Sequence, residues 1–361
     1  MFFARVINLL VTGWALFSIT NASAIGEDCT ITNFSEVSSV VQRCNNIVVR
    51  SLNVPARKSL HLSLKKGSSL TFSGITTFGV AEWGGPLVVI QGDNLRVNGE
   101  LGSKLDGQGA KYWDGKGGKG STKPVLIQIK GSGDFNNIHL LNCPERCASV
   151  HGSHLSLVGW NIDVSAGDKN KLGHNTDGFD VSGTDITVRN SVVKNQDDCL
   201  VVNHGNNMHF QNLYCSGGHG LSLSIGMSKT SYNDNVARNI TFKDCTVVNS
   251  DNGIHIKTHK DGTEGLIQDV TYKNITLHDI RNYGLEIQQD YPDHDGHPVG
   301  NVPIRGLTIT DVKGTMTGKK SVPVEVVCAT GACSDWIWSE IKISGNKKPC
   351  SMNYHPSGFS C

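Results

Sequence analysis

Short stretches in which polar and apolar residues alternate recur along most of the chain. Each begins with a polar residue (glycine in the last stretch), continues with an aliphatic and a second polar residue, and ends with an aliphatic or aromatic residue. They begin a few tens of residues apart and occupy residues 94–97, 137–140, 154–157, 185–188, 207–210, 239–242, 269–272 and 306–309. Alternation with a period of two is typical of a β-strand that buries one face.

The repetition of these strands predicts the fold class. Short strands that recur every few tens of residues, with Gly, Asn and Asp between them, are typical of a solenoid. No long amphipathic helical period occurs between residues 90 and 310. A β-sandwich would also contain short alternating strands, but one such strand per repeat favours coils. We therefore predict an all-β protein, a single-stranded right-handed parallel β-helix.

The N-terminal sequence and the composition indicate the compartment. The chain has 361 residues, of which 18% are charged, and a net charge of +1, which excludes a disordered or strongly nucleic-acid-binding protein. Arg5, an apolar run at 6–19 and Ala22-Ser23-Ala24 are typical of a secretory signal peptide. We predict a signal peptide at residues 1–24, then a single β-helix catalytic domain at residues 25–361. No later run is long enough for a membrane span, so we expect a secreted monomer without membrane or nucleic-acid partners.

The cysteines agree with an oxidising compartment. There are eleven, and ten of them form couples that are close in sequence, although sequence alone does not determine their connectivity. The couples are Cys29/Cys44, Cys143/Cys147, Cys199/Cys215, Cys328/Cys333 and Cys350/Cys361. We predict that Cys245 is a free thiol packed in the core. No CxxC pair occurs, so we predict no metal site. Sequons at Asn33, Asn239 and Asn274 could carry glycans.

Solenoid geometry brings together polar residues that are scattered in the sequence. Residues one coil apart stack at about 4.8 Å, the spacing between strands. Asp177 and Asp198 are 21 residues apart, and so are Asp198 and His219. Asp197 and Asp198 would point to opposite faces of a regular strand, so they can reach one cleft only from a bend. Clustered carboxylates raise at least one pKa, which gives a protonated acid beside ionised bases.

Each of these residues also has a simpler explanation. An aspartate beside glycine is commonly a turn residue, and His219 between glycines could be one too. Clustered aspartates can bind calcium, but no EF-hand spacing is present. His255, Lys257 and His259 alternate with apolar residues, which places them on one strand face. A cationic face beside the aspartates indicates an anionic substrate that is bound through its carboxylates.

The motifs together resemble those of the pectin-degrading polygalacturonases of glycoside hydrolase family 28, of the fungal and insect type. NTDGFD at 175–180, QDDC at 196–199, GGHG at 217–220 and HIK at 255–257 occur in the family's order. The likeness extends over nearly all of the mature chain, including WGGPL at 83–87. It implies a right-handed parallel β-helix with an open cleft and endo-acting, inverting hydrolysis of α-1,4-galacturonan. It also implies an anionic polysaccharide as partner and no cofactor.

The resemblance also implies a role for each candidate residue. Asp197 would be the general acid, Asp177 and Asp198 would activate the attacking water, and His219 would tune the protonation of the acid. The implied substrate-binding residues are Asn175, His255, Lys257 and Tyr291. The implied disulfides are Cys29–Cys44, Cys199–Cys215, Cys328–Cys333 and Cys350–Cys361; the resemblance leaves the pairing of Cys143 and Cys147 open.

One residue departs from the family pattern. His255 occupies the position where the family's last motif has arginine, and imidazole has neither the fork nor the permanent charge of a guanidinium. Losing one charged hydrogen bond costs about 1.5–3 kcal/mol. We expect His255 to bind a substrate carboxylate only when protonated, with its pKa raised in the complex. The alternatives are a weakly active or non-catalytic galacturonan-binding protein, and an exo-acting enzyme or one for another pectic chain.

Overall fold

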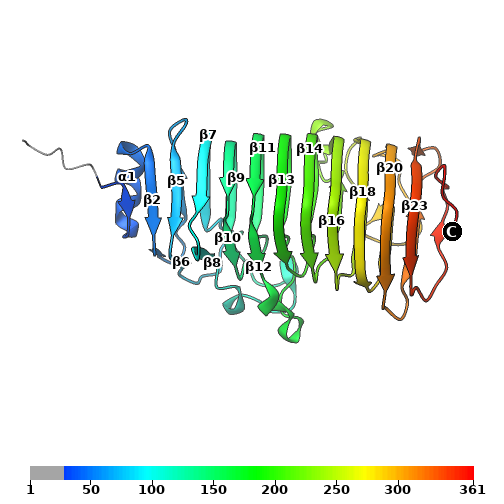
Figure 1. Ribbon diagram of the computed structural model, residues 1–361, viewed down its shortest axis with the longest axis horizontal. Coiled ribbons are helices and arrows are strands. Elements are labelled where there is room, and N and C mark those ends of the chain that lie inside the picture. Colours follow the sequence, from blue (N-terminus) through cyan, green and yellow to red (C-terminus); the bar gives the residue numbers. More distant parts are fainter. Residues whose placement is uncertain (1–27) are drawn as a thin grey trace, which may run out of the picture.

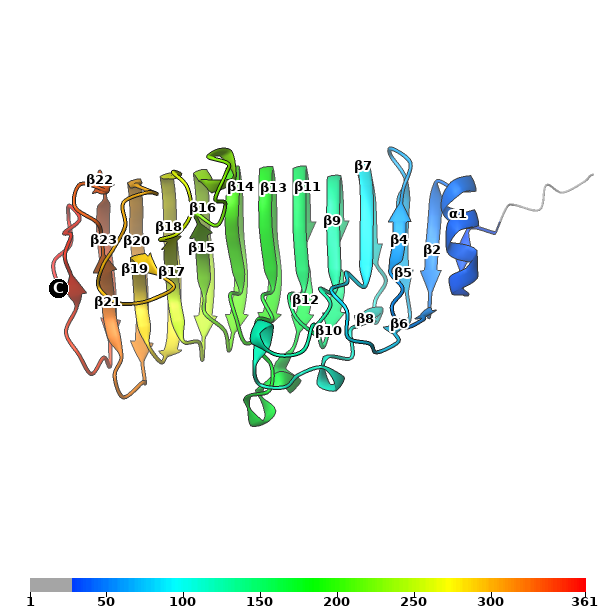
Figure 2. The same ribbon diagram turned by 180° about the vertical axis from the view of Figure 1, so that it is seen from behind.

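Residues 28–361 are described by a computed structural model, and they form one elongated stack of β-coils (Figure 1; Figure 2 shows the opposite side). All strands of this part of the chain belong to one sheet, and neighbouring coils pair in parallel. The predicted right-handed parallel β-helix is therefore confirmed. The predicted signal peptide, residues 1–24, lies outside the described residues.

Short strands succeed one another along the chain. Those of the first half are β1 (Thr30–Ile31), β2 (Asn46–Arg50), β3 (Asn53–Val54), β4 (Leu60–Ser63), β5 (Ser69–Ser73), β6 (Ile75–Phe78), β7 (Val88–Gly99), β8 (Lys104–Asp106), β9 (Ile127–Asn136), β10 (His139–Leu141), β11 (Ala148–Val158) and β12 (Asn161–Asp163). Those of the second half are β13 (Phe179–Lys194), β14 (Leu200–Ser216), β15 (Leu221–Ile225), β16 (Val236–Val248), β17 (Asn252–His259), β18 (Leu266–Ile280), β19 (Tyr283–Tyr291), β20 (Ile304–Met316), β21 (Val322–Val327), β22 (Cys333–Ser334), β23 (Ile337–Ser344) and β24 (Ser351–Met352).

Helices are few in the described part of the chain. The α-helix there is α1 (Val37–Arg43). The 3-10 helices are η1 (Phe34–Glu36), η2 (Gly109–Lys111), η3 (Gly117–Lys119), η4 (Ser165–Lys171) and η5 (Asn233–Asn235).

Residues with a left-handed backbone form the corners between the faces of the β-helix. The first residue of every alternating stretch found in the sequence has a φ between 52° and 66°. Most of these residues are Asn or Asp, which tolerate this conformation better than other non-glycine residues. Their amides also stack from coil to coil: the Asn239 Nδ2 donates a hydrogen bond to the Asn207 Oδ1 at 3.0 Å. The period-two pattern thus marks a corner followed by a strand, and not a strand alone.

The apolar residues that follow each corner build continuous columns through the core. Met208 pairs with Ile240, which pairs with Val270 on the next coil. Two positions further along, the rings of Phe242 and Tyr272 stack with their centroids 4.7 Å apart, which is the spacing between strands. Each such aromatic pair contributes about 0.5–1.5 kcal/mol beyond the area that it buries.

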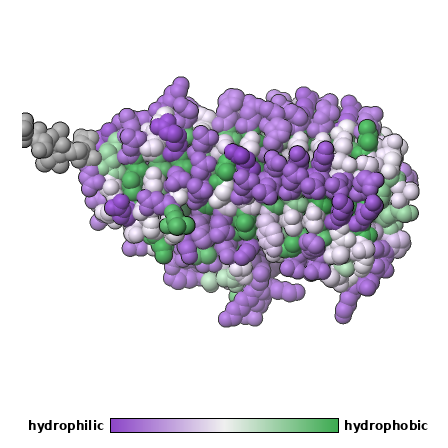
Figure 3. All heavy atoms as spheres, in the orientation of Figure 1, coloured by the Kyte–Doolittle hydropathy of each residue, from purple (hydrophilic) through white to green (hydrophobic). Residues whose placement is uncertain are grey.

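Both ends of the stack pack against other segments of the chain. At the N-terminal end, α1 packs Val37, Val40 and Val41 against the first coils (Figure 1). At the C-terminal end, Trp336 and Trp338 stack with their ring centroids 5.7 Å apart and pack against the last loop. The face seen in Figure 3 is mostly polar, with small scattered apolar groups.

The disulfides pair as the sequence couples predict. The structure contains Cys29–Cys44, Cys143–Cys147, Cys199–Cys215, Cys328–Cys333 and Cys350–Cys361. Cys245 is free and 1% exposed, as predicted. The sequon residues Asn33, Asn239 and Asn274 are exposed. Among the described residues, no helix has the length and apolar character needed to cross a membrane.

The burial of Cys245 predicts one thiol that reagents cannot reach in the folded protein. Burial raises the pKa of Cys245 to about 12, and the thiolate is the reactive form. A chromogenic thiol reagent at pH 8 should therefore detect no thiol in the native protein and one thiol per chain after denaturation. Cys245→Ser is the control and should report none in either state. Rapid labelling of the native protein, or a disulfide between chains at Cys245, would contradict this prediction.

Candidate active site

A cleft of about 710 Å³ lies along the middle coils, and charged and polar side chains dominate its lining. The loops that precede β13, together with η3, contribute to one side, and residues of β14, β15, β17 and β19 and of the turns between the strands contribute to the rest. All predicted catalytic and substrate-binding residues line this cleft: Asn175, Asp177, Asp197, Asp198, His219, His255, Lys257 and Tyr291. The fold therefore brings together side chains that span more than a hundred residues of sequence.

Three of the aspartates and His219 lie on stacked turns between strands. The Gly178 amide donates a hydrogen bond to the Asp198 carbonyl, and the His219 amide donates one to the Asp197 carbonyl, both at 2.9 Å. Asp197 and Asp198 lie at the bend between β13 and β14, and both line the cleft. A bend is what the sequence predicts for two adjacent residues that reach one cleft. A Cβ at Gly218 would clash with the Asp197 carbonyl oxygen, so glycine is required where these turns meet.

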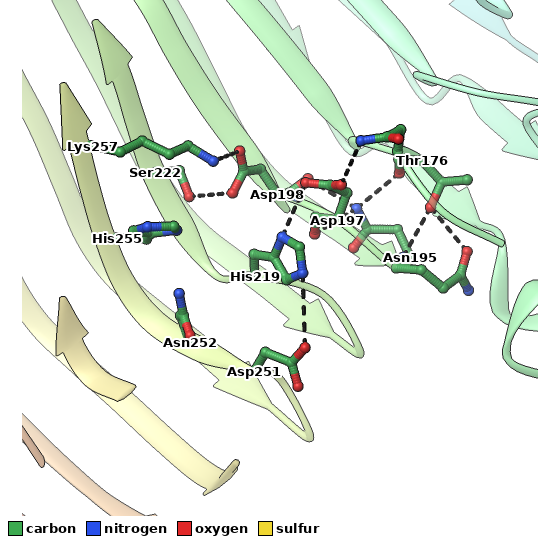
Figure 4. A network of polar contacts seen from close by, with 12 residues as sticks. Thr176, Asn195, Asp197, Asp198, His219, Ser222, Asp251, Asn252, His255 and Lys257 are labelled. Atoms are coloured by element: carbon green, nitrogen blue, oxygen red, sulfur yellow. Dashed lines mark hydrogen bonds and ion pairs between the residues drawn. The ribbon is translucent and has the colours of Figure 1, made fainter. Parts of the chain in front are cut away.

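Asp198 is held by two buried partners (Figure 4). The Ser222 hydroxyl donates to its Oδ1 at 2.6 Å, and the Lys257 ammonium donates to its Oδ2 at 2.8 Å. The side chains of Asp198 and Lys257 are 3% and 7% exposed. Burial disfavours the ammonium, but the charges of Asp198 and Asp197 outweigh it and raise the pKa of Lys257. Removing Asp198 or Lys257 alone would leave the other charge buried and unpaired, at a cost of about 3–5 kcal/mol.

Asp197 pairs with His219 on one side and with Asn175 on the other. Its Oδ1 is 3.1 Å from the His219 Nδ1, and its Oδ2 accepts a hydrogen bond from the Asn175 amide at 3.1 Å. Burial acts to raise the pKa of Asp197, but the hydrogen bond and charge of His219 and the charge of Lys257 lower it to about 2. In the free protein, Asp197 is therefore ionised.

His219 carries the matching positive charge. Burial disfavours its protonation, but the hydrogen bond and charge of Asp197 and the charge of Asp198 raise the pKa of His219 to about 9. Its Nε2 lies 3.8 Å from an Asp251 carboxylate oxygen, which orients the far side of the ring (Figure 4). His219 is thus an imidazolium at neutral pH, in contact with the carboxylate that it was predicted to tune.

Asp177 is shifted in the opposite direction from Asp197. Burial and the charge of Asp197 raise the pKa of Asp177 well above its ordinary value. Burial likewise raises the pKa of Asp180 to about 6, although the guanidinium of Arg146, 3.5 Å away, opposes it. Crowding therefore raises the pKa of at least one carboxyl, as predicted, but in the free protein the raised pKa belongs to Asp177 and not to Asp197.

The strand face predicted from the alternation of β17 is present, but of its three residues only Lys257 is a cation, because burial lowers the pKa of both His255 and His259. His255, Lys257 and His259 all line the cleft, because the residues between them point into the core. Tyr291, at the end of β19, lies beside them: its ring centroid is 5.3 Å from the Lys257 ammonium and 4.9 Å from the centroid of the His259 ring. These groups form a compact polar surface beside the aspartates.

His255 is uncharged in the free protein. Its Nε2 lies 2.8 Å from the Gln288 amide nitrogen and 3.3 Å from a Glu286 carboxylate oxygen, and the side chain is 7% exposed. Burial, together with the charges of Lys257 and His219, lowers the pKa of His255 well below its ordinary value. In the free protein, His255 is a neutral hydrogen-bonding group and does not replace the charge of an arginine.

Two residues that shape the site were not singled out in the sequence. The Asn195 amide nitrogen donates to the carbonyls of Thr176, Asp197 and Asp198, which fixes the turn that carries the aspartates. Ser222 holds Asp198 and pairs in register with His255. The sequence contained a signal for the serine: the alternation in LSLSI at 221–225 matches that of IHIKT at 254–258 one coil later, but the register between them is visible only in the fold.

Two groups of described residues have donors close enough for a metal ion. The first is Asp197, Asp198 and His219, but Asp198 is already paired with the Lys257 ammonium, which opposes a cation there. The second, at the far end of the cleft, is Glu286 with two further residues, His294 and Glu325. The sequence prediction of no metal site considered only cysteine ligands and EF-hand spacing, so it did not test for groups of carboxylates and histidines such as these.

A parallel β-helix with clustered carboxylates in an open cleft is the arrangement expected of an enzyme that acts on glycosidic bonds along a polymer. Comparison with known proteins identifies the family: the profile of Glycosyl hydrolases family 28 matches residues 44–361. The chain belongs to this family and is a glycoside hydrolase, which confirms the resemblance seen in the motifs.

Individual relatives are similar over almost the whole chain. A polygalacturonase of Phaedon cochleariae is 47% identical over 98% of this chain and 99% of its own length. Endopolygalacturonase I of Aspergillus oryzae is 43% identical over 93% of this chain and 92% of its own. Among solved structures, endopolygalacturonase I from Stereum purpureum, complexed with two galacturonate, superposes with a TM-score of 0.81 at 36% identity, covering 89% and 96% of the two chains.

The pairing of Asp197 with His219 predicts an unusually basic histidine. NMR titration should give His219 a pKa near 9, and in Asp197→Asn this value should fall toward 6.5 because the paired charge is gone. Because the folded-state pKa lies above the unfolded one, the stability that His219 contributes is complete below pH 6.5 and is lost as the pH rises through about 9. Asp251→Asn is the control and should lower this pKa less, since that carboxylate is more distant. A His219 pKa near 6.5 in the wild type would refute the pairing.

Proposed function

We propose that this protein is an endo-acting hydrolase of α-1,4-linked galacturonan, the backbone of pectin. The observation that carries the proposal is the meeting of three aspartates with His219 and Lys257 in one cleft. Carboxylates supply acid and base for cleavage of a glycosidic bond, and the adjacent cations suit a polymer that carries one carboxylate per sugar. The names of the related polygalacturonases support the same substrate class.

The proposed reaction is a single displacement with inversion. Asp197 protonates the glycosidic oxygen, while Asp177 and Asp198 hold and activate the water that attacks the anomeric carbon. The 3.1 Å contact between the Asp197 Oδ1 and the His219 Nδ1 supports this assignment, because the imidazolium can return a proton to the carboxylate. Anionic sugars in the cleft favour protonation of Asp197, since like charges disfavour a second anion.

The raised pKa of Asp177 favours a second assignment of the same roles. Asp177 would then be the proton donor, and Asp197, already ionised, would act on the water. Both assignments use the same three carboxylates and the same cleft. They differ in whether Asp197 or Asp177 is the proton donor. Replacing each residue separately therefore distinguishes them by experiment.

The proposed substrate contacts come from the groups beside the aspartates. An ammonium has three donors, and the one that Lys257 directs to Asp198 leaves two for a galacturonate carboxylate. Tyr291 shapes the same position. Asn175 both lines the cleft and bonds to Asp197, so it orients the acid as well as the sugar. The reaction needs no cofactor.

The neutral state of His255 favours a related function as the second candidate. Without an arginine-like charge, the cleft would bind a fully demethylated galacturonan less tightly and would suit another pectic chain, exo action, or binding with little turnover. The five disulfides support a secreted, extracellular protein. We also propose that it acts as a monomer.

Endo action predicts a characteristic course of product formation. Incubation of the purified protein with demethylated polygalacturonan should give a ladder of oligomers early, and shorter ones later, when products are separated by size. An internal cut reduces chain length faster than it releases monomer. Monomer from the first time point would indicate exo action, and no product at any pH between 4 and 8 would favour the binding function.

Replacement of single carboxylates should identify the proton donor. Asp197→Asn should lower turnover of polygalacturonan by about 10²–10⁴-fold, the loss typical of a general acid. On an aryl trigalacturonide, whose leaving group needs no protonation, the same variant should keep most of its activity, whereas Asp177→Asn should lose activity on both substrates. Asp311→Asn, at a partly exposed position outside the cleft with φ 54°, is the matched control.

The opposite pattern would exchange the two roles. If Asp177→Asn keeps activity on the aryl substrate and Asp197→Asn does not, Asp177 is the donor. If Asp197→Asn has wild-type turnover on the polymer, neither assignment of Asp197 is correct.

A further inference from the structure

Beyond His255, the floor of the cleft continues into an acidic column. Ser222, His255, Glu286 and Glu325 are register partners on β15, β17, β19 and β21, one per coil. Glu286 and Glu325 are thus direct neighbours at about the 4.8 Å spacing between strands. Like charges in directly opposed positions destabilise a sheet, so this pair calls for a partner of opposite charge.

Glu286 is buried with one oxygen unused. Its side chain is 1% exposed, and its Oε2 accepts a hydrogen bond from the Asn252 amide at 2.6 Å. The Oε1 is buried and has no hydrogen-bond partner in the described protein. Leaving a buried carboxylate oxygen unpaired costs about 1–3 kcal/mol or more. The asparagine therefore fixes the carboxylate while one of its oxygens stays available.

The unused oxygen faces a histidine from the loop after β19. The His294 Nε2 lies 3.7 Å from the Glu286 Oε1, too far for a hydrogen bond. The donor atoms of Glu286, His294 and Glu325 all lie within 4.8 Å of one another. The loop is held in place, because the Asp290 carbonyl accepts from the amides of Asp293 and His294. Three donors thus converge from two strands and one braced loop.

We propose that Glu286, His294 and Glu325 bind a divalent transition-metal ion at the end of the cleft, with Zn²⁺ as the ion that suits the donors best. Two ligand atoms at 2.0–2.1 Å from a tetrahedral zinc ion are about 3.3 Å apart, so the 3.7 Å separation needs only a small adjustment. One imidazole with two carboxylates suits zinc, whereas Mg²⁺ and Ca²⁺ prefer oxygen ligands throughout. Three protein ligands leave a fourth position open.

The proposed metal site lies beside His255, the position at which the resemblance to the family implies an arginine. Glu286 is in contact with His255 and, like His294, lines the cleft, so the open position of the metal faces the space that a substrate would occupy. A bound cation would neutralise the two carboxylates and place positive charge next to the neutral imidazole. This site goes beyond the proposed function, because the metal binds whether or not the protein cleaves galacturonan.

Metal binding can be measured on the purified protein without any substrate. The full chain is treated with a chelator, dialysed, and titrated with ZnCl₂ by isothermal calorimetry. The wild type should bind one equivalent, and His294→Ala and Glu325→Gln should bind at least about tenfold more weakly. Asn252→Ser, which frees the Glu286 carboxylate to rotate, should weaken binding by about 10–100-fold. His297→Ala, an exposed histidine of the same loop, is the matched control and should bind as the wild type does.

Several outcomes would overturn the proposal. They are no zinc binding by the wild type, equal binding by wild type and His294→Ala, or binding of MgCl₂ as tight as that of ZnCl₂. His294 is in an exposed loop, so its removal should leave the fold intact, which circular dichroism verifies. Activity on polygalacturonan is measured separately. A failure of the zinc proposal can therefore be distinguished from a failure of the proposed hydrolase function.

Discussion

Every part of this molecule depends on the hydrogen-bonded stacking of one coil on the next at the spacing of β-strands. That spacing aligns identical positions of successive coils, which lets Phe242 and Tyr272 stack in the core and Asn207 and Asn239 form an amide ladder at a corner. The same alignment places the turns with Asp177, Asp198 and His219 next to one another. The core, the corners and the cleft therefore follow from the same stacking, because each consists of side chains at equivalent positions of successive coils.

The electrostatics of the cleft follow from packing several carboxylates and cations at this short spacing. The ionised Asp197 is stabilised by the imidazolium of His219, and Asp198 by the buried ammonium of Lys257. Asp177 has no such partner among the described residues, and burial and the charge of Asp197 raise its pKa. Neighbouring residues of the same type thus differ in pKa, which is the condition for one to donate a proton while another accepts one.

Variation along the columns adjusts the site without changing the fold. His255 stands where the resemblance to the family implies an arginine, and the next coil contributes Glu286 in register with it. The imidazole and the carboxylate are 3.3 Å apart, so the two residues form one local environment. A β-helix tolerates such changes, since each coil contacts only its neighbours and the core columns are unaffected.

The sequence by itself was enough to predict the parallel β-helix, the cysteine couples and the candidate residues, because alternation and short cysteine spacings are local features of the chain. It also predicted the bend at Asp197 and Asp198, since neighbouring strand residues cannot face one cleft. Only the tertiary structure decided that the pKa of Asp177 is raised while that of Asp197 is lowered, that His255 is neutral, and that Glu286 and Glu325 meet His294. Those properties depend on burial and on distances between coils, and the varying lengths of the loops conceal the register from which these distances follow.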